Sequence, residues 1–243
     1  MRQFGLIGYP LSHSFSKGYF AEKFKNENIT DAHYDTFPLE NIHLIEQLFN
    51  EKPNLFGLNV TIPYKQQVIP FLDSLDEAAA KIGAVNTIKF IDGKKIGYNS
   101  DVYGFEMSLK PLLEKHHNFA LILGTGGASK AVEYVLEQLN INFQYVSRTK
   151  SKQTITYQEI DEQLMNKSTV IINTSPIGMY PNIETAPEIP YQFISVQHLL
   201  YDLVYNPEVT LFLKKGIEKG AKTKNGLEML HLQAERSWEI WNS

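Results

Sequence analysis

Polar side chains suited to binding and proton transfer follow several strand-like segments in the first 101 residues. The segment GLNVTIPYK contains Asn59, Thr61 and Lys65, and the later segments GAVNT and GYNSD supply Asn86 and Asp101. Amides and hydroxyls can hydrogen-bond a ligand with several hydroxyl groups, and a lysine and a carboxylate can exchange protons with it. The set resembles a polyol site that transfers protons, although a lysine of unknown surroundings is most often only a surface residue.

A glycine-rich turn joins the apolar run FALIL to a segment of helical periodicity. It reads Gly124-Thr125-Gly126-Gly127-Ala128-Ser129. In this context, glycines let backbone amides approach a pyrophosphate at a helix N-terminus, where the helix dipole favours an anion. Ser129 stands at the third position of the usual G-x-G-x-x-G pattern. The turn indicates a dinucleotide site, and the alternative is a tight strand-to-helix turn without a ligand.

The end of the next strand bears on the choice between NAD and NADP. An NAD site normally places Asp or Glu about 20 residues further on, to hold the ribose 2′-hydroxyl. This chain instead reads Ser147-Arg148-Thr149-Lys150. A cation and hydroxyls suit a 2′-phosphate, which a carboxylate would repel. The segment favours NADP, and the alternative is a solvated turn.

A serine-rich loop follows the first strand-like run. Residues 8–16 read GYPLSHSFS, so several hydroxyls lie close to backbone amides. Such a loop could hold a carboxylate. The alternative is that Ser14 or Ser16 caps the following helix, and His13 alone is more suited to a structural role.

The elements expected to position these residues alternate between strand and helix. Short apolar runs such as QFGLIG, HYDTF and TVIIN alternate with helical patterns, which is typical of α/β architecture. Ala128, Ala131, Val132, Val135, Leu136 and Leu139 form one helical face, inside a pattern expected of a doubly wound parallel sheet. We expect two α/β domains: residues 1–101 with 226–243 for the substrate, and residues 102–225, Rossmann-like, for the cofactor. Helical segments are also expected from Val102 to Glu114, the candidate hinge between the domains, and from Thr156 to Met165. The helical segment from Leu227 to Trp241 is expected to pack back on the first domain.

Bulk composition excludes several functional classes. The 243 residues carry a net charge of −4 with a pI near 6.0, which gives no cationic field for nucleic acid. There is no cysteine, hence no thiolate zinc site, and we expect no metal centre. No signal peptide or membrane span is expected, so the sequence predicts a cytoplasmic protein. Its state as a monomer or a homodimer stays open.

Nine segments together resemble the shikimate dehydrogenase family over nearly the whole chain. In order, they are GYPLSHSFS, NVTIPYK, IGAVNT, GYNSD, LGTGGASKAV, SRT, NTSPIGM, YDLVYNP and GLEMLHLQA. The resemblance implies an oxidoreductase that reversibly reduces 3-dehydroshikimate to shikimate with NADPH, in the route to chorismate and the aromatic amino acids.

The resemblance also implies roles for individual residues. Lys65 and Asp101 would form the catalytic pair, and the substrate would contact Ser14 and Ser16 through its carboxylate and Thr61, Asn86, Tyr205 and Gln233 elsewhere. The pyrophosphate would lie on Gly124, Gly126, Gly127 and Ala128, the 2′-phosphate on Ser147, Arg148 and Thr149, and the nicotinamide beside Gly226 and Met229. Lys17, Tyr64 and Ser147 depart from the usual pattern, where the family often has Pro, His and Asn.

Two alternatives remain at this stage. A quinate/shikimate dehydrogenase that also uses NAD would need the same polyol-binding residues, although SRT argues against a preference for NAD. A non-catalytic NADP-dependent sensor would be expected to lack Lys65 or Asp101, and both are present.

Overall fold

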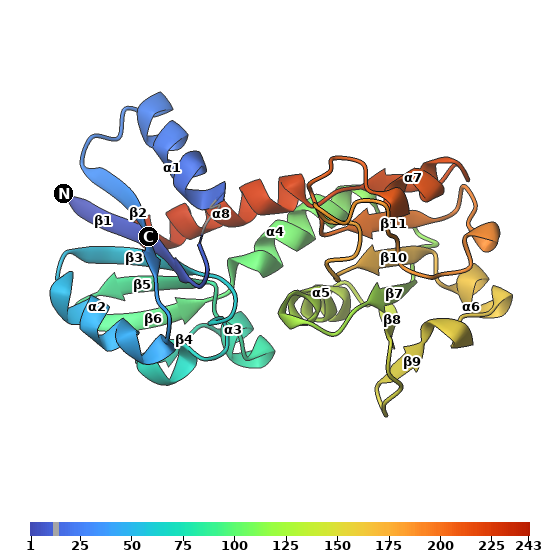
Figure 1. Ribbon diagram of the computed structural model, residues 1–243, viewed down its shortest axis with the longest axis horizontal. Coiled ribbons are helices and arrows are strands. Elements are labelled where there is room, and N and C mark those ends of the chain that lie inside the picture. The colour runs from blue at the N-terminus through green and yellow to red at the C-terminus, as the bar shows by residue number, and fades with distance from the viewer. Residues whose placement is uncertain (12–14) are drawn as a thin grey trace. The chain divides into compact units, whose positions relative to one another are not determined.

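The structure, a computed structural model, describes residues 1–11 and 15–243 (Figure 1). It divides into two compact units, residues 1–100 with 234–243 and residues 101–233. Each unit is built on its own six-stranded sheet with helices packed against it, which confirms the predicted fold class of two α/β domains. The domain boundaries expected from the motifs remain a prediction.

The sheet of the first unit is mixed. Its order is β2-β1-β3-β5-β6-β4, with β1 parallel to both of its neighbours and β5 antiparallel to both of its own. The strands are β1 (Arg2–Gly8), β2 (Ala32–Pro38), β3 (Leu55–Val60), β4 (Ser74–Leu75), β5 (Thr87–Ile91) and β6 (Lys94–Tyr98). The carboxyl ends of β1 and β3 therefore meet at one edge, where the serine-rich loop and the Lys65 segment begin.

Alternation along β1 and β3 gives this sheet two different faces. Ile7, Leu58 and Val60 belong to one buried cluster with residues of α2 (Ile45–Glu51), whereas Phe4 belongs to another with residues of α1 (Phe15–Asn26) and with Trp241 of α8 (Leu227–Asn242). The C-terminal end of α8 therefore packs in the first unit, as the sequence predicted.

The sheet of the second unit is fully parallel, with the order β12-β11-β10-β7-β8-β9. The strands are β7 (Phe119–Leu123), β8 (Asn142–Ser147), β9 (Thr154–Thr156), β10 (Val170–Asn173), β11 (Leu199–Asp202) and β12 (Lys222–Lys224). Counted from β7, this is the doubly wound order 3-2-1-4-5-6, whose direction reverses between β7 and β10. Ligands of such sheets bind beyond the carboxyl ends of the strands at that reversal.

The two faces of this parallel sheet are buried by different helices. Ala120 and Ile122 belong to a cluster with residues of α4 (Ser100–Leu109) and α5 (Gly127–Gln138). Leu121 and Leu123 belong to a cluster with residues of α6 (Glu162–Lys167) and α7 (Leu211–Ile217). The apolar face predicted for residues 128–139 is confirmed at Ala131, Val132, Val135 and Leu136, which are buried.

Two helical expectations need correction. The segment Val102 to Glu114 is α-helical only as far as Leu109 and continues as the 3-10 turn η3 (Lys110–Leu112), because Pro111 lacks the N–H that an α-helix needs. The segment from Thr156 to Met165 is broken: Thr156 ends β9, η4 (Tyr157–Glu159) follows, and α6 starts only after Asp161, whose side chain accepts from Leu164 N.

The remaining short elements lie in the connections. They are η1 (Ile42–Leu44), η2 (Ile69–Phe71), α3 (Glu77–Ile82) and η5 (Tyr191–Phe193). None of the helices within residues 1–11 and 15–243 has the length and apolarity needed to cross a membrane.

Candidate functional site

Asn86 is buried directly before β5, and hydrogen bonds from its neighbours fix the orientation of its side chain. Its Oδ1 accepts from the backbone N–H of Ser100 at 2.7 Å, from Ser100 Oγ at 3.2 Å and from Thr87 Oγ1 at 3.1 Å. Because a backbone N–H can only donate, the atom that faces it must be the amide oxygen. The amide nitrogen of Asn86 is then the atom that could donate to a ligand oxygen.

The same network continues to the C-terminal helix through Ser237. Ser237 Oγ lies 2.8 Å from Thr87 Oγ1 and 3.1 Å from Ser100 Oγ, and it accepts from Asn59 Nδ2 at 2.9 Å. Asn59 Oδ1 in turn accepts from the hydroxyl of Tyr34 at 2.8 Å. Asn59, which the sequence grouped with the possible ligand contacts, is therefore used inside the protein to support Asn86.

Of the two loop serines, Ser16 belongs to the first turn of α1, and Ser14 lies outside the described residues. The side chain of Ser16 hydrogen-bonds Tyr34, whose pKa is raised by burial so that its phenol stays protonated. Tyr34 therefore joins Ser16 to Asn59, and through Asn59 to Asn86. Two residues expected to bind the substrate thus belong to one hydrogen-bonded network.

Thr61 and Lys65 lie on the segment that follows β3. Thr61 N donates to Ile7 O at 2.9 Å, and the carbonyl of Lys65 accepts from Val85 N at 2.7 Å, one residue before Asn86. Both side chains are half-buried. These backbone bonds place the Lys65 segment beside the segment of Asn86, two residues that the sequence grouped in one polyol-binding set.

Asp101 and Gln233 are on two helices of the second unit that cross closely. Asp101 is in the first turn of α4 and Gln233 is on α8. At Gly104, a Cβ would lie 2.6 Å from Met229 O and 3.1 Å from Gln233 N, so only glycine allows this crossing. Asp101 is three residues before Gly104 and shares its side of α4. Tyr205 follows β11 and is exposed.

The glycine-rich turn lies at the reversal of strand order, between β7 and α5. Gly124 has φ +112°, and a Cβ there would meet Thr174 Oγ1 at 2.9 Å. Gly126 is the N-cap of α5 and makes no side-chain capping bond, and the space around Gly126 and Gly127 is open. The first N–H groups of α5 and Ala128 can therefore be approached closely, which fits a pyrophosphate.

Ser129 replaces the third glycine without disturbing the turn. It is buried, and its hydroxyl donates to Gly126 O at 2.7 Å. This bond satisfies the extra polar atom locally, so the departure from the usual fingerprint leaves the open amides in place.

The two cations after β8 have different surroundings. Lys150 forms an ion pair with Glu159 and holds the pKa of that carboxyl down at about 2. Arg148 is exposed, and its guanidinium makes no hydrogen bond or ion pair with the part of the chain that the structure describes. Ser147 and Thr149 flank it, and residues 147–150 at the end of β8 include no Asp or Glu. These residues fit a 2′-phosphate, with Arg148 as the available cation.

Gly226 and Met229 come directly before and within α8. A Cβ on Gly226 would lie 2.1 Å from Leu203 O, and Gly226 N donates to Val204 O at 3.2 Å. Met229 is buried in the cluster of α4 and α5. The glycine is thus required by the close approach of the chain to the end of β11.

Sequence reasoning missed a buried carboxylate that ties the ends of β10 and β11. Asp202 Oδ1 accepts from Asn173 Nδ2 at 2.9 Å and from Val204 N at 3.0 Å, and Oδ2 accepts from Thr210 Oγ1 at 2.6 Å. Asn173 Oδ1 accepts in turn from Ser175 N and Oγ. The segments NTSPIGM and YDLVYNP could have indicated this carboxylate. Each contains an Asn or Asp at the end of a buried strand, and such a side chain needs hydrogen-bond partners.

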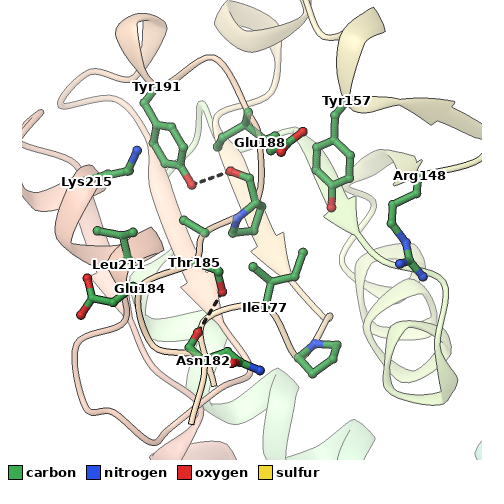
Figure 2. Close-up of a pocket in the computed structure, with 14 residues that line it drawn as sticks. Arg148, Tyr157, Ile177, Asn182, Glu184, Thr185, Glu188, Tyr191, Leu211 and Lys215 are labelled. Carbon is green, nitrogen blue, oxygen red and sulfur yellow. Dashed lines mark hydrogen bonds between the residues drawn. The ribbon is translucent and has the colours of Figure 1, made fainter. Parts of the chain in front are cut away.

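An open cavity of about 880 Å³ lies beyond β8 and β10 in the second unit. Figure 2 shows Arg148 and Tyr157 on one wall and Tyr191 and Lys215 on the other. Over the residues described, no group of three or more His, Asp or Glu could hold a metal ion.

Comparison with known proteins gives consistent results. The profile described as the shikimate dehydrogenase substrate binding domain matches residues 6–88. A shikimate dehydrogenase (NADP(+)) of Methanosphaera stadtmanae is 39% identical over 255 residues, covering 98% of this chain and 90% of the relative.

Solved structures agree with this relative. The Thermus thermophilus shikimate 5-dehydrogenase in complex with NADP(H) and shikimate has a TM-score of 0.87 at 26% identity, covering 99% of this chain and 93% of that one. The Listeria monocytogenes shikimate 5-dehydrogenase in complex with shikimate and NAD has a TM-score of 0.90 at 27% identity, covering 100% and 92%.

Proposed function

Because the chain belongs to the shikimate dehydrogenase family, we propose that it catalyses the reversible NADPH-dependent reduction of 3-dehydroshikimate to shikimate. The observation that carries the proposal is the buried network that fixes Asn86 beside the Lys65 segment. It fixes an amide donor next to the segment that carries Lys65, and an amide donor near a lysine suits a polyhydroxylated keto acid.

We assign the substrate contacts to the residues that the family motifs indicate. Ser14 and Ser16 bind the carboxylate, while Thr61, Asn86 and Gln233 bind ring oxygens and Tyr205 approaches the ring. The network gives Asn86 a defined polarity: it donates its N–H to a substrate oxygen, since its own oxygen is already used. Such a donor suits a ketone oxygen or a hydroxyl that accepts.

Bound NADPH supplies the hydride for the carbonyl carbon. Lys65 donates a proton to the carbonyl oxygen of the substrate, which takes up negative charge as the hydride arrives. Its ammonium group is the acid that we assign to this step, and the backbone hydrogen bond between Val85 and Lys65 keeps the Lys65 segment beside Asn86. Asp101 binds a substrate hydroxyl and orients the ammonium group. Both residues of the predicted catalytic pair keep these roles in the proposal.

We assign the cofactor contacts to residues of the second unit. Gly124, Gly126, Gly127 and Ala128 receive the pyrophosphate, Ser147, Arg148 and Thr149 the 2′-phosphate, and Gly226 and Met229 lie by the nicotinamide. The fit is supported by the open amides of α5 and by the exposed guanidinium of Arg148, which has no hydrogen-bond or ion-pair partner among the described residues. The NADP expected from the sequence agrees with the names of the relatives.

The experiment that tests this function measures absorbance at 340 nm, with shikimate or quinate paired with NADP or NAD in all four combinations. Fast reduction with shikimate and NADP alone is the expected result. Comparable turnover with quinate or NAD would indicate a broader dehydrogenase, which the NAD complex of the Listeria relative makes worth testing. Inactivity in all four combinations would indicate a sensor.

We also propose that the protein is cytoplasmic. Its proposed partners are small molecules, and neither nucleic acid nor membranes are among them. Cell fractionation tests the location. Sedimentation of the purified protein distinguishes a monomer from a homodimer, both of which the sequence leaves open.

A further inference from the structure

We propose that the hydroxyl of Tyr157 binds the 2′-phosphate of NADP together with Arg148, and that Tyr157 is therefore a residue that determines cofactor specificity. This inference rests on the proposed function. It adds Tyr157 to the residues assigned above. Tyr157 lies nine positions after Arg148, outside the SRT segment.

The location of Tyr157 is the first argument. Tyr157 and Arg148 line the same cavity, and Figure 2 shows the phenol and the guanidinium extending in the same direction from neighbouring segments. They are also close enough for the guanidinium charge to act on the phenol pKa. A phosphate bound by Arg148 on the cavity side therefore lies within reach of the phenol.

The state of the Tyr157 hydroxyl is the second argument. Burial raises its pKa, so it remains a neutral donor near pH 7. Within residues 1–11 and 15–243, no protein group hydrogen-bonds this hydroxyl, and the same holds for the Arg148 guanidinium. Two neighbouring donors without acceptors, one of them cationic, match the needs of a phosphate dianion.

The turn that carries Tyr157 is fixed by the neighbouring Lys150–Glu159 pair. Glu159 accepts from Thr156 N at 2.8 Å and from Thr156 Oγ1 at 3.1 Å, which closes a capping box around η4. Lys150 neutralises that carboxylate. Lys150, the cation nearest to Arg148 in the sequence, thus stabilises the turn that carries Tyr157 and does not itself bind the phosphate.

Charge sets the position of the phosphate within the cavity. Glu188 also acts on Tyr157, and its charge raises the phenol pKa, in opposition to Arg148. In Figure 2 its carboxylate lies between Tyr157 and Tyr191. A phosphate would be repelled from that part of the cavity, which confines it to the Arg148 end.

Tyr191 offers a matched control on the opposite wall. Its hydroxyl donates to Pro187 O at 2.8 Å, and Lys215 Nζ lies 4.6 Å from its ring centroid. Its polar atom is already satisfied by the protein. Removal of this hydroxyl should leave phosphate recognition unchanged.

The test compares wild type, Tyr157→Phe and Tyr191→Phe by titration calorimetry with 2′,5′-ADP and with 5′-AMP, which lacks the 2′-phosphate. Loss of one hydrogen bond to a charged group should weaken 2′,5′-ADP binding about tenfold in Tyr157→Phe. We expect 5′-AMP to bind all three proteins equally. The ratio of KM values for NADPH and NADH should rise by a similar factor in Tyr157→Phe alone.

The outcomes separate this inference from the function beneath it. If wild type binds 2′,5′-ADP more tightly than 5′-AMP and Tyr157→Phe retains that preference, the role of Tyr157 is refuted and the function stands. Equal weakening of both ligands would also refute it, because the effect would not depend on the phosphate. If wild type shows no preference for 2′,5′-ADP, the NADP-dependent function itself fails.

Discussion

Lys65 is the side chain to which we assign the proton that accompanies hydride transfer. Lys65→Ala should lower kcat by about 10²–10⁴-fold, the usual range for a lost general acid, with a much smaller change in the KM for shikimate. Steady-state kinetics at saturating NADP measure both constants. Lys94→Ala, which removes an exposed lysine from β6, is the control and should behave as wild type. An unchanged kcat in Lys65→Ala would exclude the assignment.

Arg148 and Lys150 provide a second comparison between single residues. Arg148→Ala should raise the KM for NADPH by at least tenfold and leave the KM for NADH nearly unchanged, because only NADPH carries the 2′-phosphate. Lys150→Ala removes a cation that already has a carboxylate partner. It should affect the KM for NADPH only through the turn that carries Tyr157, and therefore less than Arg148→Ala does. Equal losses for both cofactors in Arg148→Ala would contradict the role in phosphate binding.

At the scale of elements, Asp202 joins the ends of β10 and β11 to the start of α7. Burial raises its pKa to about 6, although the three hydrogen bonds that it accepts act in the opposite direction. Because the pKa is higher in the folded than in the unfolded chain, protonation of Asp202 favours the folded state. This contribution is fully present below the unfolded pKa and is lost as the pH rises through about 6.

Asp202→Asn should remove this pH dependence while keeping the shape of the side chain. The unfolding free energy of wild type, taken relative to Asp202→Asn, should rise by about 1 kcal/mol between pH 7 and pH 5. Urea unfolding of both proteins at the two pH values measures the difference. A constant difference would show that Asp202 has the same pKa in the folded and unfolded chains.

Element patterns in the sequence predicted most of the second unit, because parallel strands and amphipathic helices have clear periodicity. FALIL, the glycine-rich turn and the following helix were all placed correctly. The break after Thr156 was missed because its cause is a capping box, whose two partners are local polar residues rather than part of a hydrophobic period. Local hydrogen bonds of this kind can override a helical pattern.

The site was less predictable than the fold, since residue type does not reveal a residue's partners. Asn59 and Asn86 looked equivalent, yet Asn59 is used internally and Asn86 keeps its amide nitrogen for a ligand. Arg148 and Lys150 also looked equivalent, and only the structure shows that Glu159 pairs with one of them. Tyr157 gave no signal, because its relation to Arg148 depends on how β9 and η4 follow β8.

At the scale of the whole molecule, the end of the chain completes the unit formed by its beginning. Residues 234–243 group with residues 1–100, and the indole of Trp241 is buried there. Its ring centroid lies 4.8 Å from that of Phe4, and its Nε1 donates to Ile88 O at 2.9 Å. A Cβ on Gly57 would lie 2.2 Å from the indole, so the absence of a side chain at this position of β3 leaves the space that the indole fills.

Trp241→Ala should therefore destabilise the first unit selectively, by about 3–5 kcal/mol as for other buried aromatic residues. Urea unfolding followed by the fluorescence of Trp238, which packs in the same unit, measures this loss. Leu227→Ala, at the exposed opposite end of α8, is the matched control and should change stability by less than about 0.5 kcal/mol. The second unit has its own core, so Trp241→Ala should still bind 2′,5′-ADP in the absence of urea. If that binding were lost together with the Trp238 transition, the two units would be energetically coupled, and the cofactor site would depend on the end of the chain as much as the substrate site does.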